Sequence, residues 1–218
     1  MPDIQVNERL IRFLIFLPLF FLSLAIHEFA HAWSAYKFGD NTAKNEGRLT
    51  LNPLKHIDLF GSVLMPIMAF ASGFALIGWA KPVPVNPRNF RNPHRDDIVV
   101  SAAGPISNFV LSFIFFAFFI LLQLLEVNNP RVFNILWMGV YFNVFLGLFN
   151  LLPIPPLDGS HIVFNLFPNR LTASFMRLGI YGTIVLMVFI YSPLWALFIK
   201  FVNYILGFFN FLEKVIVG

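Results

Sequence analysis

The sequence has no cysteine and few charged residues. Without cysteine it can form no disulfide bond and offer no thiolate to a metal, so any metal ligands must come from histidine, aspartate or glutamate. Only 12% of the 218 residues are charged, which leaves no hydrophilic stretch long enough for a separate soluble domain. The net charge of +4 does not indicate nucleic acid binding, because most basic residues lie in loops beside apolar runs. We therefore expect a single domain, residues 1–218, embedded in a lipid bilayer.

Apolar residues make up 58% of the chain and gather in long uncharged runs. Each run has about twenty residues or more, the length that a helix needs to cross roughly 30 Å of hydrocarbon. The runs are residues 13–36, 59–80, 98–125, 132–157 and 178–199, the last continuing after Lys200 to residue 212. Ser192-Pro193 interrupts the last run and predicts two closely spaced helices, or one span and an interfacial helix. The pattern predicts an all-α polytopic membrane protein with about five to six transmembrane or re-entrant segments.

Two short stretches predict a small β-like, membrane-associated element. Arg48-Leu49-Thr50-Leu51 alternates polar and apolar residues, which is typical of a short strand or hairpin. The stretch from Trp79 to Pro87 contains three prolines, so it predicts a more irregular extended edge.

The first apolar run contains His27-Glu28-Phe29-Ala30-His31, an H-E-x-x-H sequence. On a helix, residues four apart share a face, so both imidazoles can reach one metal ion while Glu28 acts as a general base. Ionisable groups at membrane depth are costly unless they pair, bind a metal or face a wet cavity. We expect one Zn²⁺ per chain, with His27, His31 and a third protein ligand, because a catalytic zinc normally keeps a fourth position open.

The best candidate for the third ligand is Asp158. It follows three prolines between residues 153 and 156, which prevent the helix from continuing and force an extended chain. Irregular backbone at membrane depth is tolerated where it lines a watery cavity, so an aspartate there is well placed to bind a metal. His161 is a competing ligand, although we favour a supporting role beside the ligands or a place in the substrate cleft for it, and Glu126 is a more distant candidate.

Three motifs together resemble those of the site-2 protease family, the intramembrane zinc metalloproteases. The H-E-x-x-H sequence is followed by Gly104-Pro105-Ile106-Ser107-Asn108, which is similar to the family's G-P-x-x-N, and then by a segment that fills every defined position of N-x-x-P-x-P-x-L-D-G, from Asn150 to Gly159. The resemblance covers roughly residues 10–170. It implies His27, His31 and Asp158 as zinc ligands, Glu28 as the catalytic base and Asn150 as a polar group near the scissile carbonyl.

The resemblance also implies an activity: hydrolysis of peptide bonds in or near the transmembrane segments of other membrane proteins. The chain has no room for the substrate-filtering PDZ domain that some members insert, so we expect a short form of the family. The alternative function is a membrane transporter or metal-binding channel, in which intramembrane His and Asp residues bind a moving ion. Glu28 favours hydrolysis, because a permeation site needs no base beside its first histidine. An inactive relative is disfavoured because no catalytic position is missing.

The positions of the ligands restrict the topology. His31 and Asp158 both lie at the C-terminal ends of their predicted helices, so these helices must run parallel with an odd number of crossings between them. Run 59–80 contains glycines and a proline and has basic loops on both sides, so we interpret it as a re-entrant hairpin. Basic loops prefer the cytoplasmic face, which predicts an active site toward the cytoplasmic side of the cell membrane.

Four further polar residues allow more than one interpretation. Asn150 could cap a helix end, but we favour donation to an oxyanion. Asn108 is equally compatible with a helix kink and with substrate positioning. His56 and His94 lie in polar loops and are expected to be surface residues.

Overall fold

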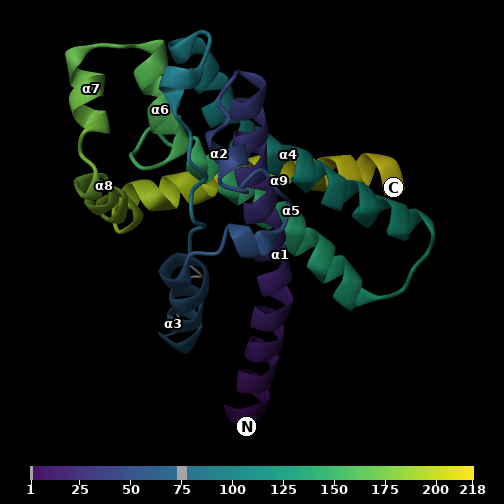
Figure 1. Cartoon of the computed structure of the whole chain (residues 1–218). Helices are drawn as coiled ribbons and strands as arrows, with labels where there is room; N and C mark the ends of the chain where they lie inside the picture. The colour runs from purple at the N-terminus through teal and green to yellow at the C-terminus, as the bar shows by residue number, and fades with distance from the viewer. Residues whose placement is uncertain (1, 73–77) are drawn as a thin grey trace.

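The computed structural model describes residues 2–72 and 78–218, and all regular structure in these ranges is helical (Figure 1). The all-α prediction is therefore confirmed for the described residues. In chain order the helices are α1 (Pro2–Lys37), α2 (Thr42–Asn45), η1 (Pro53–Lys55), η2 (Leu59–Leu64), α3 (Met65–Ser72), η3 (Pro87–Asn89), α4 (Pro93–Leu124), α5 (Pro130–Asn150), α6 (Asp158–Leu166), α7 (Arg170–Met176), α8 (Ile180–Ile190) and α9 (Pro193–Val217).

Four described helices are long and apolar enough to cross a membrane: residues 13–37 of α1, and α4, α5 and α9. The pair formed by α7 and α8 would add a fifth if it is counted as one span, although it is bent by 89°. Four to five candidate spans make this a multi-pass membrane protein. The α3 region is too short to be counted among them.

The helix ends follow the residues that predicted them. α5 ends at Asn150, and the proline-rich stretch after it forms turns until α6 begins at Asp158. The expected break near Ser192 is also confirmed, because the Ser192 hydroxyl accepts a hydrogen bond from Leu194 N and caps α9. α8, at 11 residues, is about 16 Å long and too short to cross the bilayer alone.

Three long helices meet at one end of the molecule. α4 and α5 form an antiparallel hairpin, and α4 also packs along α1 (Figure 1). α1 and α4 run in opposite directions, since His27 contacts Asn108 whereas His31, further along α1, contacts Val100, which comes earlier in α4. The C-terminal ends of α1 and α5 therefore reach the same site, as the ligand positions required.

A second region, formed by α9 against the α4–α5 hairpin, has an apolar core. α9 contributes a stripe at helical spacing, Phe198, Val202, Leu206 and Phe209, which packs against buried residues of α4 and α5. Small residues allow the close approach of α4 and α5: a side chain at Gly139 would collide with the ring of Phe115. This apolar cluster holds the helices at fixed positions around the polar site.

The two ends of the 59–80 segment lie side by side. Trp79 N donates to Gly61 O at 3.1 Å, and Ser62 Oγ donates to Trp79 O at 2.7 Å. A Cβ on Gly61 would overlap the Trp79 indole, so glycine is required at this crossing. The proposed turn of the hairpin falls partly in residues 73–77, outside the described residues.

The strand expected at Arg48–Leu51 is absent from the described structure. The guanidinium of Arg48 is buried and donates to Lys81 O at 2.7 Å, while Thr50 O lies 2.9 Å from His56 Nε2. The His56 ring therefore bonds the Thr50 carbonyl that a neighbouring strand would pair. The prediction for His56 was also wrong, because only 2% of this residue is exposed.

Candidate metal centre

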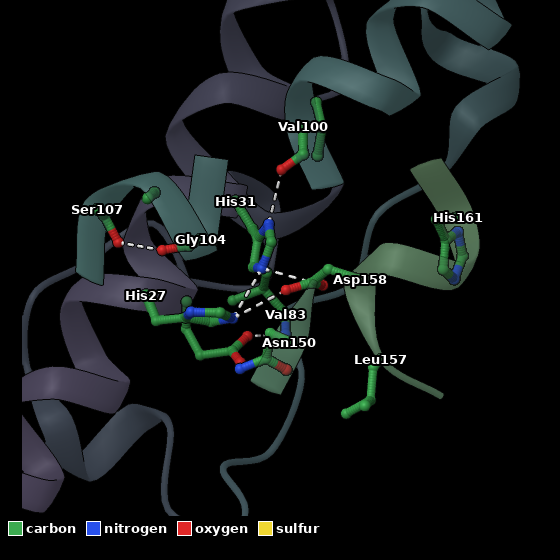
Figure 2. A network of polar contacts seen from close by, with 12 residues as sticks. His27, His31, Val83, Val100, Gly104, Ser107, Asn150, Leu157, Asp158 and His161 are labelled. Atoms are coloured by element: carbon green, nitrogen blue, oxygen red, sulfur yellow. Dashed lines mark hydrogen bonds and ion pairs between the residues drawn. The ribbon is translucent and has the colours of Figure 1, made fainter. Parts of the chain in front are cut away.

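α1 and the start of α6 bring three potential metal ligands together. His27, His31 and Asp158 each offer a donor atom, and these atoms lie within 4.8 Å of one another (Figure 2). The Nε2 atom of His27 is 3.3 Å from one carboxylate oxygen of Asp158, and that of His31 is 3.4 Å from the other. Among the described residues neither His161 nor Glu126 belongs to this group.

The partner of His31 fixes which of its ring nitrogens carries hydrogen. His31 Nδ1 lies 2.7 Å from the carbonyl oxygen of Val100, which can only accept a hydrogen bond. Nδ1 must therefore be the donor. In the neutral ring, Nε2 then presents a lone pair to the centre of the group, as a metal ligand must.

A buried chain of amides fixes His27 in the same form. Asn143 Nδ2 donates to Gly139 O at 2.9 Å, which turns Asn143 Oδ1 toward Asn108 Nδ2, 3.0 Å away. Asn108 Oδ1 must then face His27 Nδ1, at 2.7 Å, so Nδ1 is again the donor. Ser23 extends the chain by accepting from Asn143 Nδ2 at 3.0 Å, and all three of these polar residues are 0% exposed.

The resulting arrangement favours a bound cation. The Nε2 atoms of His27 and His31 are 3.0 Å apart, and since both present lone pairs they repel each other in the neutral form. The Oδ2 atom of Asp158 is buried and accepts no hydrogen bond from the described residues. A buried polar atom without a partner is costly, and a metal ion among the three donors would satisfy all of them. The two imidazoles and the carboxylate therefore fit the zinc site that the sequence predicted.

Gly104 of α4 makes space for this group. A Cβ at this position would overlap the rings of both His27 and His31. The glycine of the G-P-x-x-N sequence is thus explained by close packing against the imidazoles, and its asparagine by the hydrogen bond to His27. The sequence did not predict either contact.

Glu28 is held by the extended chain that follows α3. Val83 N donates to Glu28 Oε2 at 2.8 Å, and 8% of Glu28 is exposed. The contact keeps the carboxylate at the wall of the cavity that also exposes His27 and His31. Sequence reasoning missed Val83, because a backbone donor has no signature in the side-chain pattern.

A cavity of about 560 Å³ opens onto the group. Asn150 lines it together with Val83 and Asp158, and all three residues are labelled in Figure 2. Asn150 does not cap the end of α5, because its Nδ2 donates back to Leu146 O at 3.0 Å. One amide hydrogen remains for another acceptor.

Comparisons with known proteins agree with this geometry. Residues 15–133 and 125–194 match the model of peptidase family M50. The chain belongs to this family. It is 43% identical over 178 residues to "Putative zinc metalloprotease YwhC" of Bacillus subtilis, an alignment that covers 79% of this chain and 78% of the relative.

A second relative is more distant and longer. The chain is 36% identical over 143 residues to "Putative zinc metalloprotease Rip2" of Mycolicibacterium smegmatis, covering 63% of this chain and 51% of that protein. No solved structure matches the chain.

The family, the metal-binding group and the apolar helices together identify an intramembrane zinc metalloprotease. The transporter alternative is not favoured, because the chain belongs to a peptidase family. Glu28 also lies beside His27 in the lining of the cavity.

Proposed function

We propose that this chain hydrolyses peptide bonds in or near transmembrane segments of other membrane proteins, at a zinc held by His27, His31 and Asp158. The observation that carries the proposal is the buried carboxylate oxygen of Asp158, which has no hydrogen bond and lies beside two imidazole lone pairs. When bound there, zinc supplies a Lewis acid that makes water a nucleophile near neutral pH and polarises a carbonyl.

Glu28 is the general base in this proposal. Its carboxylate accepts a proton from the attacking water and later delivers it to the departing amine, so that the base is regenerated. Val83 N–H holds Oε2, which leaves Oε1 as the oxygen that exchanges protons. Burial keeps bulk water from competing for this carboxylate.

Asn150 is the second residue with a direct role. Its free amide hydrogen can be donated to the carbonyl oxygen as negative charge develops there. The bond to Leu146 O restricts the rotation of the amide, so less ordering is needed when substrate arrives. Asn108 and Asn143 act indirectly, through His27: their hydrogen bonds keep Nε2 of this ring unprotonated.

Substrate must present an extended backbone, because a helix hides its carbonyls in hydrogen bonds. The chain from Trp79 to Pro87 lines part of the cavity, is not helical before Pro87, and passes directly beside Glu28. We assign it as the β-like edge along which an unwound segment is laid. The Leu59–Ala80 segment before it enters and leaves the membrane on one face, and gives five to six membrane segments when counted with α7 and α8.

The membrane orientation follows from the basic loops. Lys44, Arg48 and Lys55 precede the re-entrant segment, and a second group of basic residues follows it, so this end of the molecule faces the cytoplasm. The active site of this single domain, residues 1–218, therefore opens toward the cytoplasmic side of the cell membrane.

The activity is tested with purified protein in liposomes and a panel of single-pass transmembrane substrates. Cleavage should occur, should stop when a zinc chelator is added, and should return when zinc is restored. Intact substrates throughout, with zinc fully bound, would overturn the proposed function.

The orientation is tested with single cysteines, because the native chain has none. Lys55→Cys and Arg88→Cys should be labelled by an impermeant thiol reagent from the same face of the membrane. Labelling from opposite faces would show that residues 59–80 span the membrane.

A further inference from the structure

A second polar group lies in the same cavity, one helical turn beyond the metal-binding residues. Asp97 of α4 and His161 of α6 both line the cavity, and His161 Nδ1 is 3.6 Å from Asp97 Oδ2. The mechanism above uses neither residue. Sequence reasoning placed His161 near the site, as a supporting or substrate-cleft residue more than as a ligand, and did not single out Asp97.

Asp97 is a buried carboxylate whose ion-pair partner is the His161 ring, which carries a charge only when it is protonated. Only 7% of the residue is exposed, and no lysine or arginine among the described side chains forms an ion pair with it. Asn165 Nδ2 donates to Oδ2, whereas His161 lies beyond hydrogen-bond distance. Oδ1 has no hydrogen bond from the described residues. Because Oδ1 has no such bond and is not enclosed by protein atoms, it faces the cavity, where a cation on a bound molecule can pair with it.

The position of Asp97 along the cavity can be deduced from the helix contacts. Moving from His27 to His31 on α1 corresponds to moving from Asn108 to Val100 on α4. Asp97 lies three residues beyond Val100 in that direction, or about 4.5 Å at the rise of a helix. An extended peptide advances about 3.3 Å per residue, so Asp97 faces the substrate one or two residues from the point of cleavage.

The opposite end of the cavity is apolar. Phe20 and Leu24 line it from α1, and Phe142 and Phe145 line it from α5. From Phe20 to His31 the cavity follows α1 for about 16 Å, which accommodates roughly five extended residues. The cavity thus has an apolar half toward the membrane interior and a carboxylate beyond the metal centre.

We propose that Asp97 selects substrates with a lysine or arginine one or two residues from the scissile bond, on the side away from the apolar end of the cavity. The proposal rests on the proposed function, since it assigns part of the substrate. The cation of the substrate pairs with Oδ1, while Asn165 keeps Oδ2 in place.

The chemistry of membrane proteins makes such substrates common. Lysine and arginine are concentrated at the cytoplasmic ends of transmembrane segments, and the apolar residues next to them match the other half of the cavity. A cut at this boundary would release a fragment whose new end lies at the membrane surface.

The test uses three synthetic single-pass peptides that are identical except for lysine, glutamine or glutamate at the position facing Asp97. Wild-type protein should cleave them in the order Lys, Gln, Glu, with kcat/KM about tenfold higher for Lys than for Gln, as expected for a partly buried ion pair. Asp97→Asn should reduce the Lys to Gln ratio to near one, and Asp97→Lys should favour Glu. Glu46→Gln, which removes an exposed carboxylate, should leave the wild-type order unchanged.

The outcomes separate this inference from the proposed function. Equal cleavage of the three peptides by wild-type protein, or an unchanged preference in Asp97→Asn, overturns the assignment of Asp97. The wild-type ranking decides the question even if the Asp97 variants fail to fold. Peptide affinities for the Glu28→Gln protein give the same ranking without hydrolysis, so absence of cleavage overturns only the proposed function, while equal affinities overturn the selection by Asp97.

Discussion

Two carboxylates, Asp40 and Asp158, show how a structural site differs from a reactive one. Asp40 is 0% exposed and receives hydrogen bonds from Asn86 N, Asn89 Nδ2 and both the backbone and hydroxyl of Thr42. Asp158 is only partly buried, with 21% of its side chain exposed, and its buried Oδ2 receives none from the described residues and faces two imidazole lone pairs. The oxygens of Asp40 are satisfied by hydrogen bonds from the protein, whereas Oδ2 of Asp158 needs a bound ligand to be satisfied.

The acid–base behaviour of Asp40 agrees with its structural role. Burial alone would raise the pKa of this carboxyl, but the hydrogen bonds from Asn86, Thr42 and Asn89 outweigh burial and lower its pKa below the ordinary 3.8. These bonds join the end of α1 to the chain that follows Val83. Asp40 therefore helps to hold in place the segment that positions Glu28.

The largest effect should come from Asp158→Ala. Removing the carboxylate leaves two imidazoles, so the protein should lose most of its bound zinc and all measurable cleavage. Metal analysis after dialysis measures the zinc, with His161→Phe and Glu126→Ala as matched controls for the two rejected ligands. Full zinc content in Asp158→Ala would remove this residue from the metal site.

Glu28→Gln should separate catalysis from metal binding. The amide has the same size and cannot accept the proton, so cleavage should fall by roughly 10²–10⁴-fold while zinc stays bound. Zinc content and the cleavage rate are measured on the same preparation, with Glu46→Gln as the control. Cleavage at the wild-type rate would refute Glu28 as the base.

A smaller effect is expected from Asn108→Leu. Without this acceptor for Nδ1, neither the tautomer nor the orientation of the His27 ring is fixed. Zinc binding should therefore weaken by about 10–100-fold. Asn108→Asp keeps that acceptor and should bind zinc more tightly than Asn108→Leu. Competition with a chelator measures both affinities, and equal affinities would limit Asn108 to packing.

The smallest effect should come from Asp40→Asn. Both carboxylate oxygens of Asp40 accept hydrogen bonds, and the NH₂ group of asparagine cannot accept the bond that one of them receives. We expect a loss of about 1–3 kcal/mol in the free energy of unfolding at pH 7, with the metal site intact. Because folding lowers the pKa of Asp40, its stabilisation is present above pH 3.8 and is lost as pH falls through the lower folded value. Denaturant unfolding in detergent should therefore show the two proteins converging below pH 3.8. A difference in stability that persists once pH has fallen below the folded pKa of Asp40 would contradict this account.

The sequence predicted the parts of the site that lie on one helix or at a break in the chain. The spacing of His27 and His31 and the prolines before Asp158 are local signals, and the parallel arrangement of α1 and α5 followed from them. Asn143, Val83 and Asp97 were missed because their roles depend on contacts between distant segments. The strand expected at Arg48–Leu51 failed for the same reason, since the ring of His56 bonds the Thr50 carbonyl that a neighbouring strand would pair.

X-ray absorption at the zinc edge tests the central claim most directly. The account predicts a first shell of two imidazole nitrogens and carboxylate or water oxygens, all at about 2.0–2.2 Å, in wild-type protein. The Asp158→Ala protein, reloaded with zinc, should lose the carboxylate contribution. A wild-type spectrum without imidazole, or one that Asp158→Ala leaves unchanged, would contradict the assignment of His27, His31 and Asp158 as the ligands.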